Sequence, residues 1–312
     1  MKLCAKVKTV IRTLTDSEFR FCFLAGKGRK GHVPDEEFLK RVYRYKVGRE
    51  LNLTDPVFYT EKLQWLKLHD HRPEYTRMVD KYAVKQYIAE TIGQEYVIPL
   101  LGVWDRVEDI DFEKLPRQFV LKTTHDSGCA VICKDKAKLN IPAVKRKLRY
   151  YLKRNYYAHN REWPYKNVPH RIIAEEYMED SRQGELRDYK FFTFGGVPKV
   201  LYIAQGRGKG CPTVADFFDM DFHHLPFTID HETAPVPPEK PVNFERMKEL
   251  AAQLSAETPQ LRVDFYEVDG RLYFGEMTFF HCSGMAPFHP EQWDRTFGDW
   301  VTLPVKQAEA RL

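Results

Sequence analysis

The most regular pattern of apolar and polar positions lies between residues 261 and 278. Over residues 261–266, apolar side chains alternate with more polar ones, which is the period of two expected of a half-buried strand. A second strand-like run, residues 272–278, follows the dipeptide Asp269-Gly270, which is typical of hairpin turns. The pattern therefore predicts an antiparallel hairpin.

The length of the hairpin loop decides which side chains share a face. A two-residue loop would place Asp264 and Glu276 on opposite faces of the sheet. A three-residue loop, residues 268–270 with its glycine in the left-handed conformation, places Arg262 opposite Glu276 and makes Asp264 a diagonal neighbour, about 7 Å away. We predict this second register, which also brings Thr278 to the same surface.

Two carboxylates close together repel each other unless a cation lies between them. Mg²⁺ is the oxygen-seeking cation that carboxylates hold beside substrate phosphates. The hairpin thus predicts a magnesium site between Asp264 and Glu276. The alternative is a surface hairpin with a salt bridge between Arg262 and Glu276.

Elsewhere the pattern changes from helical to strand-like near residue 96. Apolar residues at helical spacing predict helices over residues 36–43, 55–68, 74–91, 142–157, 243–257 and 291–303. Short apolar runs predict strands over residues 96–103, 118–122, 129–133, 171–178, 188–194 and 198–205. Residues 206–237 are expected to be irregular.

Lys122 ends one of these strands and is followed by a short polar loop, residues 123–128. Such a loop can present backbone N–H groups to phosphate oxygens while the lysine supplies positive charge. The loop has neither the glycine spacing nor the following helix of a P-loop. An ordinary hairpin turn is the alternative.

Composition narrows the class of protein. The 312 residues are 43% hydrophobic and 30% charged, as in globular proteins, and no run approaches about 18 apolar residues. The first residues lack the apolar segment of a secretory signal. The six cysteines show no CxxC pair and no zinc spacing. We expect a cytoplasmic protein with reduced thiols.

The net charge of +5 is concentrated near the N-terminus. The basic residues there are Lys2, Lys6, Lys8, Arg12, Arg20, Lys27, Arg29 and Lys30. They could contact anionic lipid at the inner face of the membrane or a polyanionic glycan; a solvated helical face is the alternative. The basic, aromatic stretch at 145–157 has its aromatic and leucine residues at helical spacing, so no nucleic-acid partner is expected.

Taken in order, these segments resemble the ATP-grasp superfamily, and more closely its TupA-like branch, which is associated with bacterial surface polysaccharides. The resemblance is carried by EYTRMVDKYAVKQYI, EYVIPLLGVWD, QFVLKTTHDSG, RIIAEEYMED, RDYKFFTFGGVPK, LRVDFYEVDGRLYFGEMTFF and SGMAPFHPEQWD. It implies an α+β fold with a helical N-terminal region (1–115), a small lid subdomain (116–180) and a C-terminal antiparallel sheet (181–312).

The resemblance also implies roles for individual residues. Lys81 and Lys122 correspond to the lysines that hold ATP phosphates, and Arg262 to a phosphate or acyl-phosphate contact, so Arg262 and Lys122 are the candidate catalytic residues. The implied lid loop is His125, Asp126, Ser127 and Gly128. The implied nucleotide segment is Glu175, Glu176, Tyr177 and Met178, with Asp188 facing the ribose.

The implied Mg²⁺ ligands are Asp264 and Glu276. Thr278 stands where the family usually has an asparagine, and a hydroxyl is a weaker ligand than an amide carbonyl. Arg207 and Lys209 are candidates for a further phosphate contact.

The implied activity is an ATP-dependent carboxylate–amine ligase that works through an acyl phosphate. We expect ATP and Mg²⁺ as cofactors, a uronic acid or other glycan-linked carboxylate as one substrate, and an amine or amino acid as the other. Phosphoryl transfer needs positioning and charge neutralisation rather than a covalent nucleophile, which agrees with the absence of a nucleophile signature. The alternatives are a glycosyltransferase, whose only DxD candidate is Asp219-Met220-Asp221, a kinase, and a non-catalytic polysaccharide-binding protein.

Overall fold

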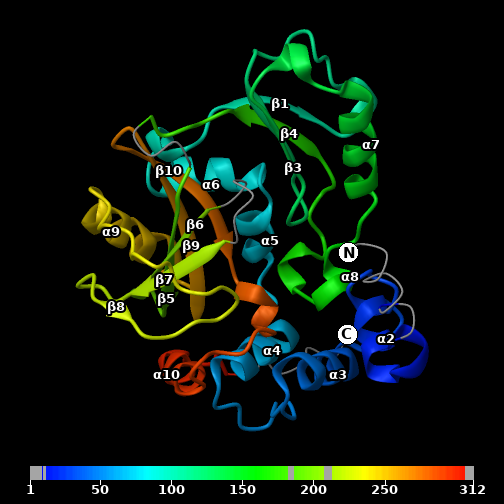
Figure 1. The fold of residues 1–312 in the computed structure, drawn as a ribbon, viewed down its shortest axis with the longest axis vertical. Helices are drawn as coiled ribbons and strands as arrows, with labels where there is room; N and C mark the ends of the chain where they lie inside the picture. The colour runs from blue at the N-terminus through cyan, green and yellow to red at the C-terminus, as the bar shows by residue number, and fades with distance from the viewer. Residues whose placement is uncertain (1–8, 10–11, 182–185, 207–212, 306–312) are drawn as a thin grey trace.

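Two antiparallel sheets with helices packed around them make up the described part of the chain (Figure 1). The structure is a computed structural model that describes residues 9, 12–181, 186–206 and 213–305. The α+β prediction is confirmed. Five basic residues with predicted contacts lie outside the described residues: Lys2, Lys6, Lys8, Arg207 and Lys209.

The larger sheet has six strands in the order β10-β9-β5-β6-β7-β8, and the smaller has four in the order β1-β4-β2-β3. The strands are β1 (Leu100–Trp104), β2 (Phe119–Thr123), β3 (Ala130–Cys133), β4 (Ile172–Glu176), β5 (Asp188–Phe194), β6 (Val197–Gln205), β7 (Val214–Phe218), β8 (His224–Leu225), β9 (Gln260–Val268) and β10 (Arg271–Thr278). The smaller sheet therefore takes β1 from before residue 116, and the three-part division of the chain stays a prediction.

Helices cover both sheets. They are α2 (Ser17–Ala25), α3 (Asp35–Val47), α4 (Tyr59–His69), α5 (Pro73–Val79), α6 (Ala83–Thr91), α7 (Ile141–Leu152), α8 (Tyr157–Asn160), α9 (Phe244–Ser255) and α10 (Gln292–Trp300). Figure 1 shows α7 beside the smaller sheet, α9 outside the larger sheet, and α5 and α6 in the centre of the molecule. In the described residues, no helix is both long enough and apolar enough to span a bilayer.

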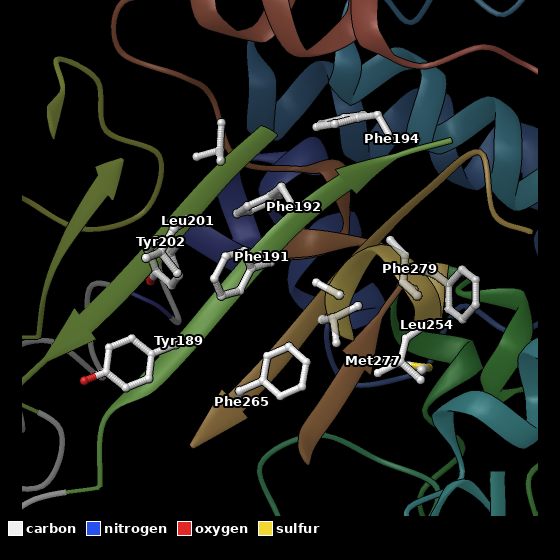
Figure 2. Close-up of a cluster of buried hydrophobic side chains, with 14 of the residues drawn as sticks. Tyr189, Phe191, Phe192, Phe194, Leu201, Tyr202, Leu254, Phe265, Met277 and Phe279 are labelled. Atoms are coloured by element: carbon white, nitrogen blue, oxygen red, sulfur yellow. The ribbon is translucent and has the colours of Figure 1, made fainter. Parts of the chain in front are cut away.

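The main core lies on the larger sheet, whose strand β5 is buried along its whole length. Figure 2 shows Phe191 and Phe192 of β5 with Leu201 of β6 and Phe265 of β9, the two neighbouring strands. A separate core beneath the smaller sheet includes Phe119, Leu121, Val144, Leu148 and Ile172. Charged side chains from both sheets line the space between them, among them Glu175 of the smaller sheet and Lys190 and Arg262 of the larger.

The central hairpin has a different turn from the one predicted. Val268 pairs with Arg271, so the loop contains only Asp269 and Gly270, both in the left-handed region with φ 49° and 82°. This is the backbone of a tight two-residue hairpin turn, whose right-handed twist matches the strands. The predicted three-residue loop is wrong, although its left-handed glycine is present.

A β-bulge at Gly275 restores the shared face that this short turn would otherwise remove. The register shifts between Phe274 and Glu276, so Glu276 lies opposite Asp264, and Thr278 lies opposite Arg262. A Cβ at Gly275 would lie 3.0 Å from the carbonyl oxygen of Asp264, so this close approach of two strands favours glycine. The prediction that Arg262 lies opposite Glu276 is therefore wrong: Arg262 lies two pairs further along, opposite Thr278.

The helix predicted over residues 74–91 is two helices. α5 ends before Asp80, whose backbone is extended, and Oδ1 of Asp80 accepts a 2.8 Å hydrogen bond from the backbone N–H of Tyr82. The backbone N–H of Lys81 donates to the carbonyl of Thr124. This break turns Lys81 away from a continuous helix face and brings it next to the polar loop after β2.

Strands β7 and β8 lie within the segment expected to be irregular, so that expectation is wrong for them. Asp216 interrupts the apolar run of β7, so the hydrophobic pattern does not predict this strand. The carboxylate of Asp216 is fully buried and lies 2.9 Å from Nε2 of His224 on β8. A polar pair with a buried carboxylate and a 35% exposed imidazole therefore links β7 to the edge strand β8.

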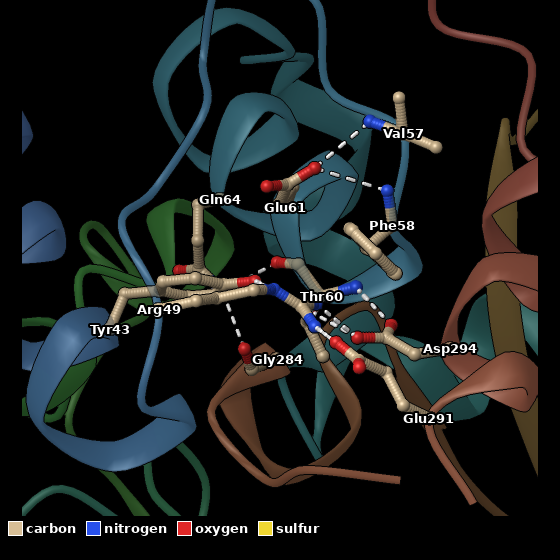
Figure 3. Close-up of polar contacts among 10 residues, drawn as sticks. All are labelled: Tyr43, Arg49, Val57, Phe58, Thr60, Glu61, Gln64, Gly284, Glu291 and Asp294. Carbon is tan, nitrogen blue, oxygen red and sulfur yellow. Dashed lines mark hydrogen bonds and ion pairs between the residues drawn. The ribbon is translucent and has the colours of Figure 1, made fainter.

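A buried polar cluster connects the N-terminal helices to the last helix (Figure 3). Asp294 of α10 accepts hydrogen bonds from the backbone N–H and the hydroxyl of Thr60, at 2.9 and 2.8 Å, and pairs with the guanidinium of Arg49. Gln64 donates 2.9 Å to the carbonyl of Gly284. We call this cluster the α4–α10 clasp. It fixes the segment after β10 against α4.

Candidate active site

A cavity of about 440 Å³ lies between the two sheets, with α5 and α6 along one side. This volume is in the range of small-molecule sites. Its apolar wall is formed by Met78, Val79, Val84, Ile88, Val97, Ile98, Phe274 and Met277. Its charged wall is formed by Lys81, Lys85, Lys122, Glu175, Asp188, Lys190, Arg262 and Glu276. With five cations against three carboxylates, this cavity suits a ligand that has an apolar ring and several negative charges.

On the smaller sheet, one carboxylate holds two lysines. Glu175 of β4 is buried, and its oxygens lie 2.5 Å from Nζ of Lys85 and 2.6 Å from Nζ of Lys122. Burial alone would raise the pKa of Glu175, but the two ammonium groups lower it below its usual value. Glu175 therefore stays ionised and orients both lysines at the cavity.

On the larger sheet, Arg262 organises the acidic residues of the hairpin. Its Nε and Nη2 each lie 2.8 Å from an oxygen of Asp264, and Nη2 also lies 2.9 Å from Oε1 of Glu276. Lys190 of β5 pairs with Asp264 as well, and lies 3.6 Å from Asp188. A charge-assisted bidentate pair of this kind is rigid as well as strong.

The two predicted metal ligands have different surroundings. Asp264 is fully buried, and both its oxygens are occupied by Arg262 and Lys190. Glu276 remains 46% exposed at the cavity. Desolvation raises the pKa of Glu276, but Lys190, Arg262 and other nearby cations lower it to about 2.

These donors fit Mg²⁺ through Glu276. Its carboxylate is ionised and open to the cavity, and the hydroxyl of Thr278 lies 3.5 Å from its Oε1. Oxygen ligands of this type suit Mg²⁺, which keeps several waters and bridges to phosphates. Asp264 would have to exchange Lys190 for the metal.

The predicted lid loop lies between α5 and the smaller sheet. Ser127 and Gly128 line the cavity, and Nζ of Lys81 donates to the carbonyl of Asp126. Asp126 itself is buried and accepts a 2.6 Å hydrogen bond from the hydroxyl of Thr123. The part of the loop that reaches the cavity is therefore its last two residues.

His125 does not line the cavity and is buried against the ring of His170, with 3.6 Å between the ring centroids. Burial, and next the proximity of His170, lower the pKa of His125 to about 4. The unfolded chain binds this proton near pH 6.5 and the folded chain near pH 4. The stability that depends on neutral His125 is thus complete above pH 6.5 and is lost as the pH falls toward 4.

We expect the wild-type protein to lose about 3 kcal/mol of unfolding free energy through His125 between pH 6.5 and pH 4. A His125→Gln variant removes this titration, so its unfolding free energy should fall less over the same range. Urea unfolding at several pH values measures both. Parallel pH profiles of the two proteins would contradict the burial of a neutral His125.

Three residues of the predicted nucleotide segment do not line the cavity: Glu176, Tyr177 and Met178. Glu176 is exposed, and the ring of Tyr177 contacts Nζ of Lys134 at 5.4 Å. Their assignment to adenine stays a prediction. In contrast, Asp188 lies on the cavity wall, where a ribose contact was predicted.

Two lysines of the cavity were absent from the sequence prediction. Lys85 follows Lys81 by four residues, which is one helical turn, and Lys190 follows Asp188 by two, which is the same face of a strand. These spacings were the available signals. The first is weakened by the break between α5 and α6, which a sequence pattern does not show.

A smaller cavity of about 340 Å³ adjoins the first. The two share Ser127, Tyr165, Arg262 and Glu276, and the smaller one is closed by Tyr156, Asn160, Glu162, Thr278, Phe280, Cys282 and Ser283. Burial raises the pKa of Glu162 and lowers that of nearby Lys67. Nζ of Lys67 donates a 2.8 Å hydrogen bond to the hydroxyl oxygen of Ser283, so Lys67 supports the wall of the smaller cavity.

A group of possible metal ligands beside this cavity is unsuited to a metal. Asp230, His281 and Cys282 place ligand atoms within 4.8 Å of one another. However, Nη1 of Arg262 donates to Nδ1 of His281 at 2.7 Å, so the neutral ring keeps its proton on Nε2, which faces Cys282. Nε2 would have to lose that proton to bind a metal, and Arg262 cannot accept one in return.

Residues 61–302 match the family model described as TupA-like ATPgrasp. The chain belongs to the TupA-like ATP-grasp family. The match includes every strand described above and both cavities, and it confirms the resemblance seen in the sequence. No curated protein matches the chain.

Solved structures of similar fold include a D-alanine–D-alanine ligase from Bacillus anthracis, with 19% identity and a TM-score of 0.38 over 65% of this chain and 57% of the other. An L-amino acid ligase from Bacillus licheniformis has 16% identity and a TM-score of 0.43 over 73% of this chain and 51% of the other. At such values these similarities carry no conclusion about substrates. The chain spans little more than half the length of these proteins.

Proposed function

We propose that this TupA-like ATP-grasp protein is an ATP-dependent carboxylate–amine ligase that forms an acyl phosphate. The supporting observation is the wall that the two cavities share. Arg262 and Glu276 face both the cavity with the apolar wall and lysines and the smaller cavity with the buried Glu162. A phosphate end in the first cavity would thus meet a second substrate at this wall.

In this proposal the apolar wall holds adenine, and Lys81 and Lys122 hold the phosphates. Glu175 keeps Lys122 in place through their ion pair. Mg²⁺ would be held by Glu276 with the hydroxyl of Thr278 beside it, and by Asp264 only if that carboxylate released Lys190; when bound, it would supply charge neutralisation for the phosphates.

The reaction has two steps. A carboxylate oxygen of the substrate attacks the γ-phosphorus, and the bond to the β,γ-bridging oxygen breaks, which gives an acyl phosphate and ADP. The amine then attacks the acyl carbon, and inorganic phosphate leaves with the C–O electron pair. Both steps require mainly positioning and electrostatic stabilisation, which Arg262 and the lysines provide.

The smaller cavity suits the amine. The carboxylate of Glu162 lies in it, and an ammonium group that entered would be attracted to that carboxylate. We propose a uronic acid or a similar glycan-linked carboxylate as the acceptor and an amino acid or amine as the donor, because the family is associated with surface polysaccharides. The reaction would take place in the cytoplasm, where ATP is supplied.

The test is incubation of the protein with ATP, Mg²⁺, a panel of uronates and a panel of amino acids. We expect ADP and phosphate only when both a carboxylate and an amine are present, and a product whose mass is their sum less one water. Release of AMP, or sugar transfer from a nucleotide sugar without ATP, would overturn the proposal. A phosphorylated product that forms without any amine would indicate a kinase.

A further inference from the structure

A third cavity lies outside the proposed active site, between the loop after α2 and the segment that joins α7 to α8. Its volume is about 610 Å³, larger than either cavity described above. The titratable side chains on its wall are all basic or aromatic: Lys27, Arg29, Tyr150, Lys153, Arg154 and His159. Among the described residues, no aspartate or glutamate lines it. We call it the basic cavity.

On α7 and α3, two basic residues are paired with acids. Arg149 of α7 lies 2.9 Å from Glu108, and Arg41 of α3 lies 2.9 Å from Glu18. By contrast, within the described part of the chain no carboxylate pairs with Lys27, Arg29 or Lys153. Three positive charges therefore converge on one cavity without counter-charges.

Arg154 is held in place on the wall. Nδ1 of His159 lies 2.9 Å from the carbonyl oxygen of Gly26, so Nδ1 carries the proton and donates this hydrogen bond. Nε2 is then unprotonated and accepts a 3.3 Å hydrogen bond from Nη2 of Arg154. His159 thus acts as a neutral support for the guanidinium rather than as another cation. The nearest acid is Asp126, whose Oδ2 lies 4.0 Å from Nη1 of Arg154.

The remaining charge can be counted. Four cationic side chains less the charge of Asp126 leave a formal +3. The C-terminal ends of α2 and α7 also approach the cavity, and each contributes roughly −0.5 of an elementary charge. A net charge of about +2 remains. One carboxylate would neutralise only half of it, whereas a phosphate group, with a charge between about −1.5 and −2 at neutral pH, would neutralise nearly all of it.

We propose that the basic cavity binds a phosphate-bearing anion, either a soluble phosphate ester or the phosphate of a lipid headgroup. The ligand would lie directly behind the proposed active site. Residues 153–160 separate the two regions, with Arg154 and His159 facing the basic cavity and Tyr156 and Asn160 lining the smaller cavity. Through Arg154 and Asp126 the basic cavity also touches the loop that carries Ser127.

The test is a calorimetric titration with inorganic pyrophosphate on three forms of the full chain. These are the wild type, the double variant Arg29→Ala/Lys153→Ala, and the control Lys114→Ala/Lys138→Ala, which removes two equally charged side chains that are 86% and 85% exposed. We expect the first double variant to bind at least tenfold more weakly and the control to bind as the wild type does. Binding should also weaken as salt is added.

Pyrophosphate could also enter the proposed nucleotide cavity, so each titration is repeated with saturating ADP. If ADP does not bind, the proposed ligase function is in doubt, but the comparison between the two double variants still tests the basic cavity. Thermal unfolding checks that both double variants are folded.

Flotation with vesicles that contain phosphatidic acid, whose headgroup is a phosphate monoester, separates the two sources of phosphate. Vesicle binding that needs Arg29 and Lys153, without pyrophosphate binding, assigns a lipid headgroup; the reverse assigns a soluble ester. Equal affinity in all three proteins for both probes would overturn the proposal, and so would tighter binding of a galacturonate trimer than of pyrophosphate.

Discussion

The Glu276→Gln variant should lose ligase turnover by about 100-fold or more. The substitution keeps the shape of the side chain and removes the negative charge at the open end of the proposed Mg²⁺ site. Each 1.36 kcal/mol of activation free energy changes the rate about tenfold. A metal that stabilises the transition state by about 2.7 kcal/mol or more therefore accounts for this loss. The apparent affinity for Mg²⁺ should weaken as well. ADP release in the presence of both substrates measures the effect.

The matched control is Glu249→Gln on α9, where the glutamate is 66% exposed and pairs with Arg246. Its turnover should stay at the wild-type value. The fold of Glu276→Gln should survive, because Arg262 keeps its bidentate pair with Asp264. Unchanged turnover in Glu276→Gln would remove Glu276 from the reaction.

The Arg262→Met variant should lose about 3–5 kcal/mol of unfolding free energy. Asp264 is fully buried, and removal of the guanidinium leaves its carboxylate with Lys190 as the remaining cation. Breaking a buried pair costs this much because the uncompensated charge stays in the interior. The midpoint of urea unfolding measures the change.

A second substitution separates this cause from loss of packing. Asp264→Asn in the Arg262→Met background removes the buried charge, so the double variant should recover part of the lost stability. Arg246→Met, which breaks an exposed pair with Glu249, should change stability by at most about 1 kcal/mol. If the double variant had a lower unfolding free energy than Arg262→Met, burial of an unpaired charge would not be the cause of the lost stability.

The sequence was sufficient for most elements of the fold because their patterns are local. The alternation over residues 261–266 lies in β9, and the apolar runs over residues 188–194 and 198–205 lie in β5 and β6. The sequence was insufficient where contacts between strands changed what the local pattern predicts, as in the central hairpin. The shared face of Asp264 and Glu276 was predicted correctly from a wrong turn, because the bulge at Gly275 compensates for the missing loop residue.

The residues of the active-site cavity could also be predicted only in part. Charged residues at the ends of strands could be recognised singly, and eight of the predicted residues line the cavity: Lys81, Lys122, Ser127, Gly128, Glu175, Asp188, Arg262 and Glu276. The burial of Asp264 between Arg262 and Lys190 could not be predicted, because it depends on β5 lying next to β9. Pairing between strands about 75 residues apart leaves no periodic signal in the sequence.

The α4–α10 clasp has a consequence for synthesis of the protein. During translation, the backbone N–H of Thr60 and the guanidinium of Arg49 emerge more than 230 residues before their shared partner, Asp294. Until the ribosome releases that residue, α4 cannot satisfy these buried groups and its apolar face lacks Phe297. A nascent chain therefore completes the docking of α4 only after Asp294 has left the ribosome, and a chain truncated before residue 294 should be retained by chaperones.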